Sequence, residues 1–93
     1  MNIYLGKSLA GHDKNHIYVV LSEVDGYMTL ANGTTKTVDK PKRKNILHVQ
    51  VIKKLPANVR RILEDTESLN DDVIAKAVKE YNSYLDACKA QDN

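Results

Sequence analysis

The chain has 93 residues, of which 42% are hydrophobic and 28% charged, and it contains neither Trp nor Phe. A chain of this size builds one small core, so we do not expect a second full domain. The longest apolar run, residues 17–21, is too short to span a membrane, and the N-terminus lacks the pattern of a secretory signal, so we expect a cytoplasmic protein. A single cysteine, Cys88, excludes an internal disulfide and argues against a zinc site.

Charge is unevenly distributed along the chain, whose net charge is +2. Residues 1–54 contain nine Lys and Arg against four Asp and Glu, whereas residues 55–93 contain five against eight. This asymmetry predicts a basic binding surface in the first part and a solvated support in the second.

The first part has the pattern of short strands separated by turns. We expect strands at residues 3–5, 17–21, 27–31, 34–38 and 45–52. Asp25-Gly26 and Asn32-Gly33 predict hairpin turns, because both dipeptides tolerate positive φ. Residues 40–44 are expected to form a loop, since Pro41 cannot donate a hydrogen bond to a neighbouring strand. Five short strands in about 50 residues are too few for a sandwich and predict a small, strongly bent barrel.

The second part has helical spacing. Pro56 suits the start of a short helix that should end within residues 65–68. A longer helix, capped by Asn70 or Ser68, should then run to about residue 90. Its apolar stripe consists of Val73, Ile74, Ala77, Val78, Tyr81, Leu85 and Cys88. We expect this stripe to pack on the barrel, while a partner protein or a second copy of the chain, bound through residues 73–85, stays an alternative.

These patterns predict a mainly β fold with C-terminal helices. The barrel of about five strands occupies residues 1–54, and a helical extension of two helices, the second longer, occupies residues 55–93 and packs on the barrel.

The densest cluster of charge is the run Lys-Pro-Lys-Arg-Lys at residues 40–44. Clustered cations repel one another unless an anion with closely spaced charges lies opposite, and a nucleic-acid backbone is the commonest such anion. A solvated loop without a ligand is the plainer interpretation. The candidate nucleic-acid-binding residues lie in the predicted loops and beside them: Lys7, Lys14, His16, Lys36, Lys40, Lys42, Arg43, Lys44 and His48. Tyr4 and Tyr27 are candidates for base stacking, whereas Tyr18 lies in an apolar run and is expected in the core.

Two segments carry a resemblance to a known family. Residues 6–21, Gly-Lys-Ser-Leu-Ala-Gly-His-Asp-Lys-Asn-His-Ile-Tyr-Val-Val-Leu, resemble a KOW motif. The segment Pro-Lys-Arg-Lys-Asn at residues 41–45, with His48 beyond it, resembles the continuation in small bacterial KOW-domain RNA-binding proteins, which are similar to KOW-type large-subunit ribosomal proteins of archaea and eukaryotes. The resemblance covers residues 4–52, with weaker similarity at residues 71–81. It implies an SH3-like β-barrel that binds RNA, commonly ribosomal RNA, without catalytic activity. It also adds His12 and Asn15, at positions of the KOW motif, to the candidate RNA-binding residues.

Two positions depart from the family pattern. Asn15 stands where many KOW motifs have glycine, and asparagine is the next best residue for the left-handed turn required there. His12 stands where the bacterial relatives typically have arginine. A neutral imidazole lacks the fixed charge and the paired donors of a guanidinium, so we expect phosphate binding there to be weaker or to depend on pH.

The sequence offers little support for catalysis. It contains no nucleophile elbow and no phosphate-cradling glycine loop, and His12 and His16, although four residues apart, lie in a predicted turn rather than on a helix. We therefore expect no catalytic residues, no metal and no cofactor.

Two functions remain: a noncatalytic RNA-binding protein associated with ribosomal RNA or with ribosomal proteins, and a protein-interaction module that uses the basic loop or the second helix, as SH3-like or transcription-elongation KOW domains do.

Overall fold

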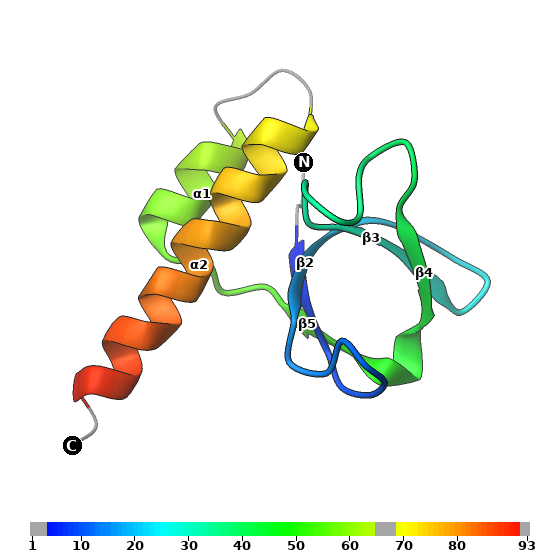
Figure 1. The fold of residues 1–93 in the computed structure, drawn as a ribbon, viewed down its shortest axis with the longest axis horizontal. Helices are drawn as coiled ribbons and strands as arrows, with labels where there is room; N and C mark the ends of the chain where they lie inside the picture. Colours follow the sequence, from blue (N-terminus) through cyan, green and yellow to red (C-terminus); the bar gives the residue numbers. More distant parts are fainter. Residues whose placement is uncertain (1–3, 65–68, 92–93) are drawn as a thin grey trace.

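The computed structural model describes residues 4–64 and 69–91. One antiparallel sheet has the strand order β4-β3-β2-β1-β5. Its strands are β1 (Tyr4–Ser8), β2 (Ile17–Val24), β3 (Tyr27–Ala31), β4 (Lys42–Asn45) and β5 (Val49–Ile52). The sheet curls into a barrel-like ring, and helices α1 (Ala57–Glu64) and α2 (Asp71–Gln91) lie together beside it (Figure 1). The predicted fold class, a small barrel-like sheet followed by two helices of which the second is longer, is confirmed.

The apolar side chains of the sheet form two clusters, because successive residues of a strand point to opposite faces. The inner cluster lies within the ring and contains Tyr18, Met28, Leu30 and Val49. The outer cluster joins strand residues Leu5, Ile17, Val19 and Ala31 to helix residues Val59, Leu63, Ile74, Ala77 and Tyr81. The helices therefore cover the outer face of β1, β2 and β3, and the sheet and the helices share this core.

The apolar stripe predicted on the second helix lies in the outer cluster. Ile74, Ala77 and Tyr81 are buried there. The partly buried members of the stripe pack against the same cluster: Val73, Val78 and Leu85. A homodimer formed through residues 73–85 would have to open this core, and it stays an untested prediction.

Two predictions for the segment between β3 and β4 are wrong. Residues 34–38 form a loop rather than a strand, because the Asn32 side chain accepts hydrogen bonds from the backbone N–H groups of Thr34 and Lys36, at 3.0 and 2.9 Å, and these bonds compete with sheet pairing. Residues 40–44 do not form a loop throughout, since β4 begins at Lys42 and pairs with β3. Pro41 lies just before β4, where its missing N–H costs no bond of the sheet.

The strand predicted over residues 45–52 is also interrupted. A 3₁₀ turn, η1 (Ile46–His48), separates β4 from β5. The Asn45 side chain accepts a hydrogen bond from the backbone N–H of Leu47 at 2.9 Å and so caps this turn. β4 and β5 are the two edge strands of the sheet, so this turn connects the two edges that face each other in the ring.

The turns and helix ends follow local sequence signals. Asp25 and Gly26 have φ of 53° and 82°, which confirms the predicted turn between β2 and β3. Pro56 immediately precedes α1, and the backbone N–H of Val73 donates to Asn70 Oδ1 at 2.9 Å, so Asn70 caps α2. The other predicted cap, Ser68, lies outside the described residues, as do Ile3 and the predicted end of the first helix. Over the ranges that the structure describes, neither helix combines the length and the apolar character needed to cross a membrane.

Candidate nucleic-acid interface

A buried carboxylate, Asp13, lies at the centre of the loop that joins β1 to β2. Its side chain is 9% exposed and accepts hydrogen bonds from Ser8 Oγ at 3.0 Å and from Tyr18 Oη at 2.9 Å. Lys42 Nζ lies 2.8 Å from Oδ2, and Lys44 Nζ lies 3.0 Å from Oδ1. Burying a carboxylate is costly unless cations and hydrogen-bond donors surround it, and Asp13 has two of each. We call these five residues the Asp13 network.

The network keeps a fixed charge at physiological pH. Burial by itself raises the pKa of Asp13, but the hydrogen bonds from Lys42, Lys44, Tyr18 and Ser8 outweigh burial and hold that pKa well below the ordinary value of 3.8. Burial, together with the bond to this carboxylate, raises the pKa of Tyr18 to about 12. Asp13 is therefore ionised and Tyr18 neutral near pH 7, so the network is a permanent link between the first loop and β4.

Strand alternation divides the basic run of β4 between two faces. Lys42 and Lys44 point inward to Asp13, and Lys44, whose side chain is only 11% exposed, also donates to the Ala10 carbonyl at 2.9 Å. Arg43 points outward, and its guanidinium lies 4.2 Å from the centroid of the exposed Tyr27 ring. Two of the three clustered cations thus hold the barrel together, while the third faces solvent.

The Asp13 network brings two distant segments of the sequence to one end of the barrel. The β1–β2 loop, residues 9–16, presents four exposed candidates: His12, Lys14, Asn15 and His16. Asn15 has φ of 74°, which confirms the expected left-handed turn, and its N–H donates to the Ser8 carbonyl at 2.7 Å. The carbonyl of the exposed His48 accepts a hydrogen bond from the Leu9 N–H at 2.8 Å, so η1 lies against the same loop. Lys7 is half-buried in β1, next to Ser8.

The remaining two candidates, Lys36 and Lys40, lie on the β3–β4 loop, residues 32–41. This loop is held against the start of α2, where the Val38 N–H donates to Asp71 Oδ1 at 2.9 Å. It also closes on itself, since the Lys36 carbonyl accepts from Asn32 and Gly33 at 2.9 and 3.0 Å. The β3–β4 loop therefore forms a second region, fixed by α2 rather than by Asp13.

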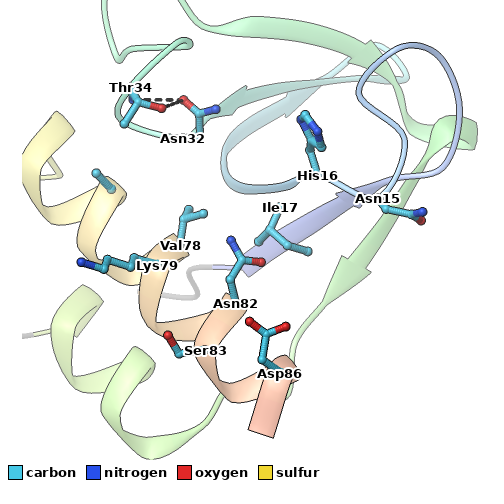
Figure 2. A pocket seen from close by; sticks show the side chains of 11 residues that line it. Asn15, His16, Ile17, Asn32, Thr34, Val78, Lys79, Asn82, Ser83 and Asp86 are labelled. Atoms are coloured by element: carbon cyan, nitrogen blue, oxygen red, sulfur yellow. Dashed lines mark hydrogen bonds between the residues drawn. The ribbon is translucent and has the colours of Figure 1, made fainter. Parts of the chain in front are cut away.

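A groove of about 510 Å³ lies between the two loops and α2 (Figure 2). The β1–β2 loop contributes Asn15 and His16, and the β3–β4 loop contributes Asn32 and Thr34. The polar residues of α2 in the groove are Lys79, Asn82, Ser83 and Asp86, and the apolar lining consists of Ile17, Ala75 and Val78. Figure 2 shows Asn82 and Asp86 extending from α2 toward the barrel. The candidate surface thus continues into a concave, mostly polar site.

Sequence reasoning missed both Asp13 and the groove residues of α2. Lys42 and Lys44 are two residues apart, so on a strand they share a face, and one acidic residue in a basic segment is a natural partner for them. That signal was available in the sequence. The groove left no comparable signal, because its three walls meet only when α2 packs on the sheet.

Within residues 4–64 and 69–91, no group of three or more His, Cys, Asp or Glu side chains is placed to hold a metal ion. Comparison of the sequence with protein-family models and with curated proteins gave no match. The resemblance to KOW-domain proteins therefore rests on the residues of this chain alone.

Proposed function

We propose that this protein is a noncatalytic RNA-binding protein that docks the end of its barrel on the phosphate backbone of a structured RNA. The observation that carries the proposal is the Asp13 network, which fixes the β1–β2 loop beside β4 and thereby brings two basic segments of the sequence together. Pre-formed surfaces bind with a smaller loss of conformational entropy than mobile loops do. The resemblance to KOW proteins supports ribosomal RNA as the target, and the cytoplasm as the location.

The charge of this surface supports an anionic ligand even after internal pairing. Lys14, Lys42, Arg43 and Lys44 are four cations, and Asp13 neutralises one of them, which leaves three positive charges. Phosphate contacts position a protein on RNA without reading its sequence. We assign these contacts chiefly to Lys14 and Arg43, because Lys42 and Lys44 are held by Asp13.

The exposed histidines have a different role in this proposal. His12 and His16 lie on the β1–β2 loop and His48 lies against it, and all three are exposed, so they offer hydrogen bonds and stacking surfaces to the RNA.

The test is binding of the purified protein to a structured ribosomal RNA fragment across a salt series, beside a duplex DNA of equal length. If the three remaining positive charges each neutralise one phosphate, the logarithm of affinity should fall with the logarithm of salt at a slope of about −2 to −3. Binding that prefers RNA and weakens with salt is the expected result. A slope near zero, or no binding at low salt, would contradict the proposal.

A matched pair of variants locates the interface. Arg43→Ala and Lys53→Ala each remove one positive charge and one cation–π contact. Lys53 follows the C-terminal end of β5, the end away from η1, and its Nζ lies 5.5 Å from the Tyr4 ring centroid. We expect Arg43→Ala to weaken RNA binding about tenfold and to reduce the salt slope by about 1, whereas Lys53→Ala changes affinity less than about twofold. Equal effects of the two substitutions would place the interface elsewhere.

A protein-interaction module is the second candidate, and one observation favours it. Leu9 and Leu47 are 43% and 78% exposed, and the hydrogen bond from Leu9 N–H to the His48 carbonyl places them near each other at the Asp13 end of the barrel. Exposed apolar side chains that lie together are typical of protein contacts. Complexes recovered from a lysate should dissociate on nuclease treatment if RNA holds them, and persist if the partner is a protein.

A further inference from the structure

The groove between the two loops and α2 differs in chemistry from the basic surface beside it. Its polar lining combines one lysine and one carboxylate with a histidine, two hydroxyl groups and three amides, and the Asn32 amide is already bonded within its own loop. A phosphate would meet the Asp86 carboxylate here, so the groove is poorly suited to the RNA backbone. Amides supply donors and acceptors together, which suits a neutral group with a hydrogen-bonding edge.

The apolar part of the lining favours a flat ligand. The half-buried Ala75 and Val78, with the buried Ile17, form the apolar part of the lining, and a planar ring can pack there beside the Asn82 amide. A volume of about 510 Å³ falls in the range of small-ligand sites and leaves room for a nucleotide. The groove also begins at Asn15 and His16, so a strand docked on the β1–β2 loop lies next to it.

We propose that this groove receives one unpaired nucleotide of the bound RNA, and that Asp86 selects a base with an exocyclic amino group. The inference rests on the proposed function and names the part of the RNA that the site takes. An ionised carboxylate only accepts hydrogen bonds, and the amino groups of cytosine and adenine are donors. Uracil presents two carbonyl oxygens beside its single ring N–H, so it sets acceptors against the carboxylate. Asn82, one helical turn before Asp86, is placed to bind the remaining edge of the base.

Lys79 supports the same assignment. It lies on α2 one turn before Asn82, and its exposed side chain extends away from Asn82 and Asp86 (Figure 2), so it can meet the phosphate of the inserted nucleotide at the rim of the groove while the base lies beside Asp86. The opposite charges of Lys79 and Asp86 thus match the opposite polarities of one nucleotide, whose phosphate is an anion and whose amino group is a donor.

The test compares oligocytidine and oligouridine of about eight nucleotides, by fluorescence anisotropy at low salt. The two pyrimidines have the same ring size and differ only in the amino group and the adjoining ring nitrogen of cytosine, which are a carbonyl oxygen and an N–H in uracil. We expect the protein to bind oligocytidine about five- to tenfold more tightly. Asp86→Asn replaces the acceptor with an amide that also donates, and should reduce the preference to less than about twofold. The control Asp72→Asn makes the same charge change on the same helix, outside the groove lining, and should keep the preference.

Each outcome separates this inference from the proposed function. Equal binding of the two oligonucleotides, or a preference that Asp86→Asn leaves intact, overturns the groove assignment. Salt-dependent binding of the structured RNA that weakens in Arg43→Ala would still leave the proposed function standing. Absence of binding to every RNA overturns both. Asp86 is exposed, so its substitution should not alter the fold, which circular dichroism checks.

Discussion

The β1–β2 loop and the β3–β4 loop both carry candidate RNA-binding residues and both line the groove, yet they are held in place by different forces. The first loop is fixed by a buried carboxylate that meets two lysines of β4. The second is fixed by the Asn32 amide, by the hydrogen bond from the Val38 N–H to Asp71 Oδ1, and by close contact of Gly33 with α2. The first loop depends on buried ion pairs, whereas the second depends on hydrogen bonds to its backbone and on the space beside α2.

This difference teaches how a small barrel can carry a basic surface without losing stability to charge repulsion. Clustered lysines on an edge strand would repel one another, but Lys42 and Lys44 share an internal counterion and point into the barrel. Inward charges on an edge strand also discourage pairing with other chains. The lysines of the β3–β4 loop, Lys36 and Lys40, are four residues apart and do not require a shared buried counterion.

The largest effect is expected from breaking the ionic loop. Asp13→Asn should lower the free energy of unfolding by about 2–4 kcal/mol, because the amide leaves Lys42 and Lys44 without a counterion while they remain partly buried. Urea denaturation followed by circular dichroism measures the change. Asp39→Asn, an exposed carboxylate on the other loop, is the control and should change stability by less than about 0.5 kcal/mol. Similar small losses for both variants would mean that Asp13 does not anchor its loop.

The β3–β4 loop should be destabilised by steric overlap with α2 rather than by the loss of an ion pair. Gly33 and Gly26 have nearly the same φ, 81° and 82°, but a Cβ at Gly33 would overlap the Asp71 carbonyl and the Ala75 backbone, whereas a Cβ at Gly26 meets nothing within 4 Å. We expect Gly33→Ala to cost about 2–3 kcal/mol and Gly26→Ala about 1 kcal/mol. Thermal unfolding of the two variants checks the difference. Equal costs would show that conformation alone, and not contact with α2, restricts this loop.

The smallest effect, and the one that separates the two mechanisms most cleanly, is the response to pH. The pKa of Asp13 is lowered in the folded protein, so the unfolded chain takes up the proton at higher pH and protonation favours unfolding. The contribution of Asp13 is therefore fully present above about pH 5 and is lost as pH falls below about 4.

The stability gap between the wild type and Asp13→Asn should accordingly narrow between about pH 5 and pH 3, as urea midpoints at a series of pH values would report. The gap in stability between the wild type and Gly33→Ala should change much less over the same range, since this substitution acts through overlap with the backbone of α2 and leaves the ion pairs of Asp13 in place. If the stability difference between the wild type and Asp13→Asn did not change with pH, the ion pairs of Asp13 would not be what stabilises the β1–β2 loop.

Much of the fold was predictable from local signals. The turn at Asp25-Gly26, the helix start after Pro56 and the cap at Asn70 are each decided by a few neighbouring residues, and each lies where the sequence indicated. The strand predicted at residues 34–38 failed because Asn32 offers its own side-chain oxygen to the backbone, which is a competing local bond.

The sequence by itself determined that the chain builds a small barrel with two helices and that its cations concentrate in residues 40–44. Only the tertiary structure decided which of those cations face solvent. Alternation along β4 turns Lys42 and Lys44 inward, and folding brings Asp13 to them from a distant loop, while Arg43 is left outside over Tyr27. Likewise the groove exists only where α2 meets two loops. Charge and pattern are properties of the chain, but pairing and shape depend on contacts between segments that are far apart in it.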